Sequence, residues 1–232
     1  MEEPEAKPLA RSSTPSAQEL VHRDGRPVPP VFELESPRFL GDEDIPFARY
    51  TSQDFFDEEM ERMWTRTWQW ACREEHVADP GDYYVYEVGP NSVLIVRDAN
   101  GEIRAYVNAC LHRGTKFRSG GSDGAFSEIR CPFHGWTWEL DGSLKRVPYA
   151  WDAPHVNARD FALPQVAVGL WGGFVIINLD ADPPPLSEYL APIPEHLENF
   201  DLSKRFVEQH IEKELDCNWK AAIEAFIENY HT

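Results

Sequence analysis

The sequence predicts a mainly β fold, in which an antiparallel β domain is flanked by helices. Between residues 70 and 180, turn residues recur about every eight to twelve positions, as they do in all-β domains. Helical spacing of apolar residues occurs before this region and again near residue 220. With 232 residues, 42% of them hydrophobic, the chain is long enough for one complete domain and part of another.

The N-terminal region is predicted to consist of two segments. Residues 1–39 are rich in Pro, Ser and charged residues and are expected to be disordered. Residues 40–69 are expected to form a helical arm, with a helix over 51–68 that starts at a capping box between Thr51 and Asp54. Its apolar face consists of five residues at helical spacing: Phe56, Met60, Met63, Trp64 and Trp68.

The β domain is expected to cover residues 70–182. Strands are predicted at 83–88, 92–98, 102–108 and 173–179, where β-branched and aromatic residues are frequent. A hairpin turns at Asn100-Gly101, and a second turns at Asp141-Gly142.

The acidic and proline-rich segment DADPPP, residues 180–185, marks a boundary, and 186–232 are expected to begin a second domain. Within it, CNWKAAIEAFIENYHT is predicted to form an amphipathic helix that starts near Asp216. The apolar stripe of this helix is Trp219, Ala222, Ile223, Phe226, Ile227 and Tyr230.

Charge and composition exclude several classes of protein. The net charge of −18 argues against a nucleic-acid-binding surface. No apolar run approaches the roughly 18 residues of a membrane span, and the acidic N-terminus has no signal-peptide or transit-peptide pattern. Four cysteines do not make a disulfide-rich secreted scaffold, so a cytoplasmic location is expected.

Two short motifs carry metal-ligand residues. Cys110-x-His112 and Cys131-x-x-His134 are separated by the eighteen residues 113–130 and lie on loops next to the predicted hairpins. A structural zinc site with two cysteines and two histidines is one interpretation, and chance is another. A zinc finger, however, places both cysteines in one motif and both histidines in the other.

One Cys and one His in each motif suits a [2Fe–2S] cluster instead, because one iron then takes two cysteines and the other two histidines. Gly114 and Gly135 follow the two motifs, where glycine allows tight turns and close approach of backbone N–H groups. Arg113 and Trp136 are expected to pack around such a cluster.

The two motifs resemble the Rieske pattern, although the spacer between them is about one residue longer than is usual, a change that a loop tolerates. In the cytochrome-complex type of Rieske domain, each motif has an additional cysteine; here Thr115 and Phe133 occupy those positions. The motifs are similar instead to those of the large (alpha) subunit of Rieske non-haem iron oxygenases, the ring-hydroxylating dioxygenase family. The resemblance covers residues 45–232 and includes DGSLKRVP, GGFVIINLD and CNWK. It implies an antiparallel β Rieske domain followed by the start of an α+β helix-grip catalytic domain.

The same resemblance assigns roles near residue 230. Asn218-Trp219-Lys220 is followed by Glu228-x-x-His231, which places the last two residues on one helix face. By resemblance, His231 is the first ligand of a mononuclear iron(II), and Glu228 is the carboxylate that bridges to a cluster histidine of a neighbouring subunit. The second histidine and the carboxylate ligand of this facial triad have no counterpart up to Thr232, so a truncated or split form is expected.

The function implied by the resemblance is that of a Rieske mono- or dioxygenase component. It takes electrons from a reductase or ferredoxin through the [2Fe–2S] cluster and delivers them to mononuclear iron(II). There O₂ hydroxylates a small organic substrate, which is expected to be aromatic. A homotrimer or hetero-oligomer is implied, with no nucleic-acid or membrane partner. A stand-alone Rieske electron-transfer protein is the alternative, and an incomplete, inactive product is a third interpretation.

Overall fold

The computed structural model describes residue 15 and residues 17–28 and 44–227. The chain divides into two units, 1–46 and 47–232. In the first unit the described part contains one helix, α1 (Ala17–Arg23). Most of segment 1–39 lies outside the described residues, and its disorder stays a prediction.

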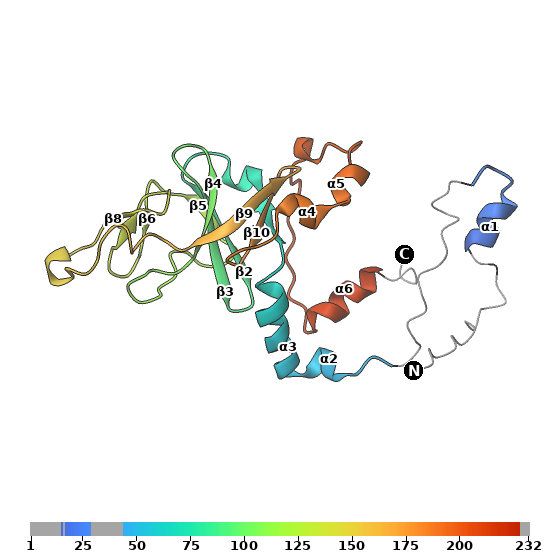
Figure 1. Ribbon diagram of the computed structural model, residues 1–232, viewed down its shortest axis with the longest axis horizontal. Coiled ribbons are helices and arrows are strands. Elements are labelled where there is room, and N and C mark those ends of the chain that lie inside the picture. Colours follow the sequence, from blue (N-terminus) through green and yellow to red (C-terminus); the bar gives the residue numbers. More distant parts are fainter. Residues whose placement is uncertain (1–14, 16, 29–43, 228–232) are drawn as a thin grey trace. The chain divides into compact units, whose positions relative to one another are not determined.

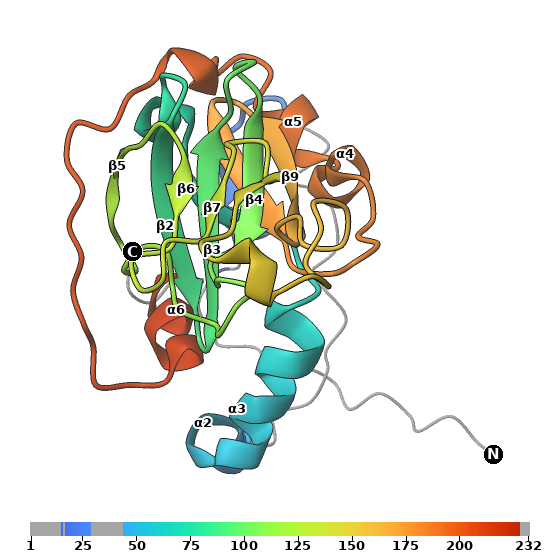
Figure 2. The ribbon, with the colours of Figure 1, turned by 90° about the vertical axis from the view of Figure 1, so that its left-hand side faces the viewer.

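The second unit contains a seven-stranded sheet in the order β1-β10-β9-β4-β3-β2-β5 and a three-stranded sheet in the order β6-β7-β8 (Figures 1 and 2). Every neighbouring pair of strands is antiparallel, which confirms the predicted fold class. The strands of the large sheet are β1 (Gln69–Arg73), β2 (Asp82–Val88), β3 (Asn91–Arg97), β4 (Ile103–Val107), β5 (Asp123–Ala125), β9 (Gln165–Trp171) and β10 (Phe174–Asn178). Those of the small sheet are β6 (Ile129–Arg130), β7 (Thr137–Trp138) and β8 (Leu144–Arg146).

Strand β3 is buried on both faces, and this divides the core into two clusters. Val93 and Ile95 pack in one cluster with the β10 residue Val175. Leu94 and Val96 point to the other face and pack in the cluster that also contains Cys110, Phe117, Cys131 and Trp138. Because successive strand residues alternate between faces, the uninterrupted apolar run of β3 supports both cores. The second core lies beneath both metal-ligand motifs.

The two predicted hairpins are confirmed. Strands β3 and β4 pair in register from Val93 with Val107 to Arg97 with Ile103. In the turn, the Asp98 carboxylate accepts the N–H groups of Asn100 at 2.8 Å and Glu102 at 2.9 Å. The second hairpin, between β7 and β8, turns at Asp141-Gly142.

Replacing Asp98 with asparagine is expected to lower the free energy of unfolding by about 1.5–3 kcal/mol. The Asp98 side chain is 1% exposed, and it also accepts Arg104 Nε at 2.6 Å. Burial alone would raise the pKa of Asp98, but the Arg104 hydrogen bond and the two backbone N–H groups outweigh it and lower the pKa. A carboxylate with a depressed pKa stabilises the fold above its unfolded-state pKa of about 3.9 and loses that contribution as the pH falls through its folded pKa.

Urea denaturation as a function of pH measures this contribution. Wild type should lose stability below about pH 4 more steeply than Asp98→Asn, because the variant lacks the titrating group. The matched control is Asp141→Asn, since the exposed Asp141 accepts the Ser143 N–H in a similar turn, whereas the partly buried Arg104 hydrogen-bonds Asp98. Equal losses of unfolding free energy in Asp98→Asn and Asp141→Asn would show that the burial of Asp98 adds nothing to the stability of the fold.

Several strands were not predicted. The most informative is β9, which pairs with β10 through a two-residue turn at Gly172-Gly173. Both glycines have positive φ, +59° and +80°, as the hairpin turn of this type requires. The Gly-Gly pair between two apolar runs was the available signal for this hairpin.

The helical arm differs from the predicted single helix. It consists of α2 (Ala48–Thr51), α3 (Gln53–Glu59) and the π-helical turn η2 (Met60–Trp64). The capping box at Thr51 and Asp54 is wrong: Ser52 Oγ accepts the Phe55 N–H at 3.3 Å, whereas Thr51 Oγ1 donates to the carbonyl of Phe47. The extended backbone at Ser52 decides between two neighbouring residues that can both cap a helix.

The predicted C-terminal helix is present as α6 (Trp219–Ile227), which starts three residues after Asp216. Two short helices, α4 (Leu186–Leu190) and α5 (Ile193–His196), lie between β10 and α6 and were not predicted. Within the described ranges, no helix has the length and apolar character needed to cross a membrane.

Candidate metal centre

The two metal-ligand motifs form matching loops. The Cys110 N–H donates to Thr115 O at 2.9 Å, and the Cys131 N–H donates to Trp136 O at 2.8 Å. In each loop the glycine four residues after the cysteine returns its N–H to the cysteine carbonyl, at 2.8 Å from Gly114 and 3.1 Å from Gly135. These glycines have φ values of +75° and +73°, which other residues rarely adopt. Each loop is therefore closed by the same pair of hydrogen bonds.

The two cysteines form a buried pair of thiols. Cys110 is 3% exposed and Cys131 is 2% exposed, and neither forms a disulfide. Burial raises the pKa of the Cys110 thiol to about 11, and the neighbouring Cys131 thiol adds to this rise. The backbone N–H groups of His112 and Arg113 hydrogen-bond the Cys110 sulfur and favour the thiolate. These donors suit a sulfur that carries negative charge when it binds a metal.

The two histidines form a second, exposed pair. Their Nδ1 atoms lie 3.2 Å apart, and their rings meet edge to face with centroids 4.7 Å apart. Two nitrogen ligands about 2.1 Å from one tetrahedral metal ion lie about 3.4 Å from each other. The Nδ1 atoms of His112 and His134 are thus spaced as two ligands of one metal ion.

The arrangement fits a two-metal cluster better than a single ion. The Cys110 thiol lies next to the Cys131 thiol, and the His112 imidazole lies next to the His134 imidazole. A cluster with one Cys-ligated iron and one His-ligated iron requires this pairing. The donor set therefore favours [2Fe–2S] over the zinc interpretation.

Aromatic side chains hold the two imidazoles differently. The buried Trp136 indole stacks on the His112 ring, with 5.3 Å between centroids and 9° between planes. Trp136 therefore packs at this site, as expected. The Phe133 ring, which is 64% exposed, lies 3.9 Å from the His134 ring. One histidine is thus fixed by the core, and the other by a surface side chain.

Asn108 anchors the first loop and was not among the predicted site residues. It is 1% exposed, and its amide nitrogen donates to Ser92 Oγ at 3.0 Å and to Arg118 O at 2.8 Å. Its amide oxygen accepts the Phe117 N–H at 2.9 Å. A lone asparagine at the end of a strand gave no signal of this role, because its partners come from two other segments.

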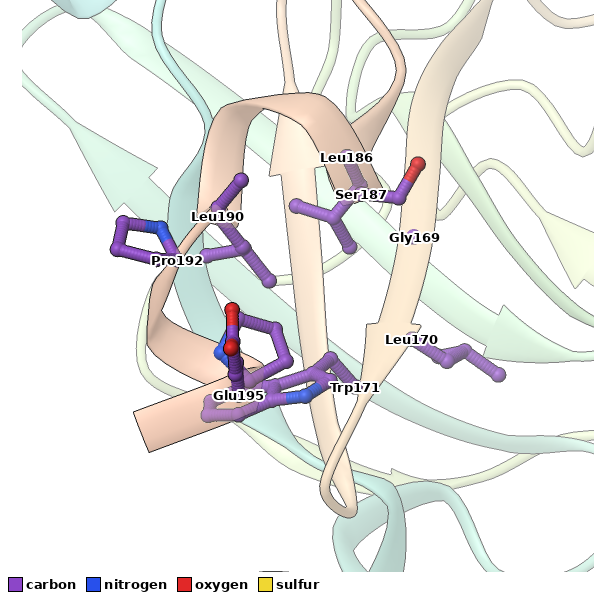
Figure 3. Close-up of a pocket in the computed structure, with 10 residues that line it drawn as sticks. Gly169, Leu170, Trp171, Leu186, Ser187, Leu190, Pro192 and Glu195 are labelled. Atoms are coloured by element: carbon purple, nitrogen blue, oxygen red, sulfur yellow. The ribbon is translucent and has the colours of Figure 1, made fainter. Parts of the chain in front are cut away.

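The histidine edges face open space. A hollow of about 400 Å³ is lined by His112, His134 and Trp136, together with Tyr149 and with Asp152 of the short 3₁₀ helix η4 (Ala150–Asp152). A separate apolar pocket of about 660 Å³ lies between β9 and the α4–α5 segment, with Leu170, Leu186 and Leu190 in its wall (Figure 3). None of the four candidate ligands lines that second pocket.

The proposed ligand His231 and the bridging residue Glu228 lie outside the described residues. The structure therefore brings Cys110, His112, Cys131 and His134 together and describes α6 only up to Ile227. The roles of Glu228 and His231 stay predictions.

Comparisons with known proteins agree with this geometry. The family described as Rieske [2Fe-2S] domain matches residues 67–157. Choline monooxygenase from Beta vulgaris is 30% identical over 95% of this chain and 48% of its own length. The biphenyl 2,3-dioxygenase alpha subunit of Rhodococcus jostii is 33% identical over 78% of this chain and 41% of its own length.

Solved structures show the same relationship. A quaternary ammonium Rieske monooxygenase in complex with L-carnitine has a TM-score of 0.74 at 28% identity, over 80% of this chain and 53% of that chain. Naphthalene 1,2-dioxygenase bound to phenanthrene has a TM-score of 0.71 at 30% identity, over 78% of this chain and 42% of that one. The chain spans about half the length of the curated relatives that it matches.

Proposed function

Because the chain contains a Rieske [2Fe–2S] domain and is homologous to the alpha subunits of Rieske oxygenases, we propose that it is the electron-accepting part of such an oxygenase. A Rieske domain implies a [2Fe–2S] cluster. We assign Cys110 and Cys131 as ligands of one iron, and His112 and His134 as ligands of the other. The observation that carries this assignment is the pairing of the Nδ1 atoms 3.2 Å apart beside a buried pair of thiols.

The protein's own residues divide the work at this centre. The buried thiols exclude water from one side of the centre. The backbone N–H groups of His112 and Arg113 stabilise the negative charge on the Cys110 sulfur. The imidazoles present their edges to the surface, where a reductase or ferredoxin can approach. When bound, the cluster supplies one-electron chemistry at a potential that histidine ligation raises above that of an all-cysteine cluster.

The complete oxygenase would pass these electrons to a mononuclear iron(II) that activates O₂. His231 is the proposed ligand from this chain, and Glu228 is the proposed carboxylate between the two centres in an oligomer. The substrate is proposed as a small organic molecule. The relatives do not favour an aromatic one, since their names include choline and carnitine as well as biphenyl. Four cysteines without a disulfide support a cytoplasmic location.

Electron uptake tests the proposal. Cluster-loaded chain, mixed anaerobically with a ferredoxin and an NAD(P)H-dependent reductase, should accept one electron and lose visible absorbance. The stand-alone carrier would also do this, so a second measurement separates the two. Addition of iron(II), O₂ and candidate substrates, together with the polypeptide that completes the iron site, should give hydroxylated product. Electron uptake without product under every such condition would favour the stand-alone carrier.

A further inference from the structure

A buried ion pair joins helix α6 to the helical arm 48–64. Lys220 Nζ lies 2.8 Å from both carboxylate oxygens of Glu59. The Lys220 side chain is 4% exposed and the Glu59 side chain 12% exposed, although the two residues are 161 positions apart in sequence. Burying two charges is costly unless both are well paired, so this contact specifies one position for the two segments.

Neighbouring contacts extend the same junction. The Trp219 indole donates to Glu59 Oε2 at 3.2 Å, and its ring meets Trp64 edge to face at 5.1 Å. Asn218 Nδ2 donates to Tyr50 O at 3.2 Å, and the Tyr50 hydroxyl donates to a Glu224 oxygen at 2.8 Å. All three residues of the Asn218-Trp219-Lys220 motif therefore bind the arm, beside which α6 lies in both ribbon views (Figures 1 and 2).

The arm is in turn fixed to the β domain. It leads directly into the edge strand β1, where Gln69 Nε2 donates to Trp64 O. The Trp68 indole donates to Pro184 O at 2.8 Å, and Asn178 Nδ2 donates to Arg66 O at 3.4 Å. The Glu59 carboxylate is thus held on a support that is continuous with the domain carrying the metal centre.

We propose that Glu59 is a positioning residue: through Lys220 and Trp219 it fixes α6, and with it the chain leading to Glu228 and His231, relative to the Rieske domain. This inference rests on the proposed function, because a chain that holds its Rieske domain and the end of α6 in one fixed arrangement can present Glu228 to the cluster of a neighbouring subunit. Glu59 touches neither proposed iron and acts only through the helix.

Hydrogen–deuterium exchange of the full 232-residue chain tests the contact. Glu59→Gln and Lys220→Met each leave one partner buried without its counter-charge, so amides of α6 should exchange at least about tenfold faster. The double variant has no unpaired charge, and its α6 should be closer to wild type than either single variant. Glu58→Gln, at an exposed carboxylate on the same helix, is the matched control and should leave α6 unchanged.

A distance measurement separates positioning from general stabilisation. A spin label on Phe226→Cys, in a Cys217→Ser background, reports its distance to the reduced cluster, since Phe226 is 84% exposed. Glu59→Gln should broaden this distance distribution while the cluster's own EPR spectrum stays the same. If a single variant does not fold while the double variant does, that difference also shows that Glu59 and Lys220 are energetically coupled.

Unchanged α6 exchange and an unchanged distance in a folded Glu59→Gln variant would overturn the proposal. So would a double variant in which α6 is looser than in both single variants. If wild type held no cluster, the proposed function would fail, but the exchange comparison would still decide whether Glu59 fixes α6.

Discussion

Replacing Cys131 with serine is expected to abolish the iron–sulfur cluster. The residue is 2% exposed and supplies one of only two thiols at the centre, and a hydroxyl is a poor substitute for thiolate toward iron. Mutations in the residues that merely support metal ligands cost about 10- to 100-fold in affinity, so loss of a ligand should cost at least that much. Bound iron, inorganic sulfide and visible absorbance, measured on protein expressed with iron and sulfide, should all fall by more than about tenfold.

The chain offers two matched controls for this variant. Cys217→Ser changes an exposed cysteine and should retain the full cluster content. Cys72→Ser changes a buried cysteine of β1, in the other core cluster, and should keep the cluster in whatever fraction remains folded. A Cys131→Ser protein with wild-type iron and sulfide would remove Cys131 from the ligand set.

Glu228→Gln is expected to slow electron transfer from the cluster to the mononuclear iron by about 5- to 10-fold in a protein that contains the complete iron site. The variant keeps the size of the side chain but exchanges a charge-assisted hydrogen bond for a neutral one, a loss of about 1–1.5 kcal/mol. Both metal centres should remain, because Glu228 is proposed as a ligand of neither. Stopped-flow reoxidation of the reduced cluster in a single turnover measures the rate.

The control for this variant is Glu214→Gln, which changes an exposed carboxylate in the segment before α6. It should reoxidise at the wild-type rate. Wild-type reoxidation in Glu228→Gln as well would mean that Glu228 is an ordinary helix residue and would weaken the proposed role of α6.

Local patterns made much of the fold and of the candidate site predictable. Asn100-Gly101 and Asp141-Gly142 specify turns within a few residues, and both hairpins form there. The two motifs with one Cys and one His each predicted the matched loops, because their spacing reflects the chemistry of the ligands.

Features that depend on distant residues were missed. Strand β1 pairs with β10 about a hundred residues later, and nothing within Gln69–Arg73 identifies that partner. The anchoring role of Asn108 and the pairing of Glu59 with Lys220 have the same cause, since each joins segments that only the tertiary fold brings together. The prediction of Thr51 as the helix N-cap was wrong for a different reason. Thr51 and Ser52 can both cap a helix, and the backbone conformation places Ser52 at the cap position.

Metal analysis combined with EPR of the reduced chain tests the central claim most directly. If Cys110, His112, Cys131 and His134 hold a [2Fe–2S] cluster, the purified protein should be brown and contain iron and inorganic sulfide in equal amounts. On reduction it should give the low-average-g signal of a Rieske centre. A colourless protein that contains zinc, with neither iron nor inorganic sulfide, would contradict the assignment.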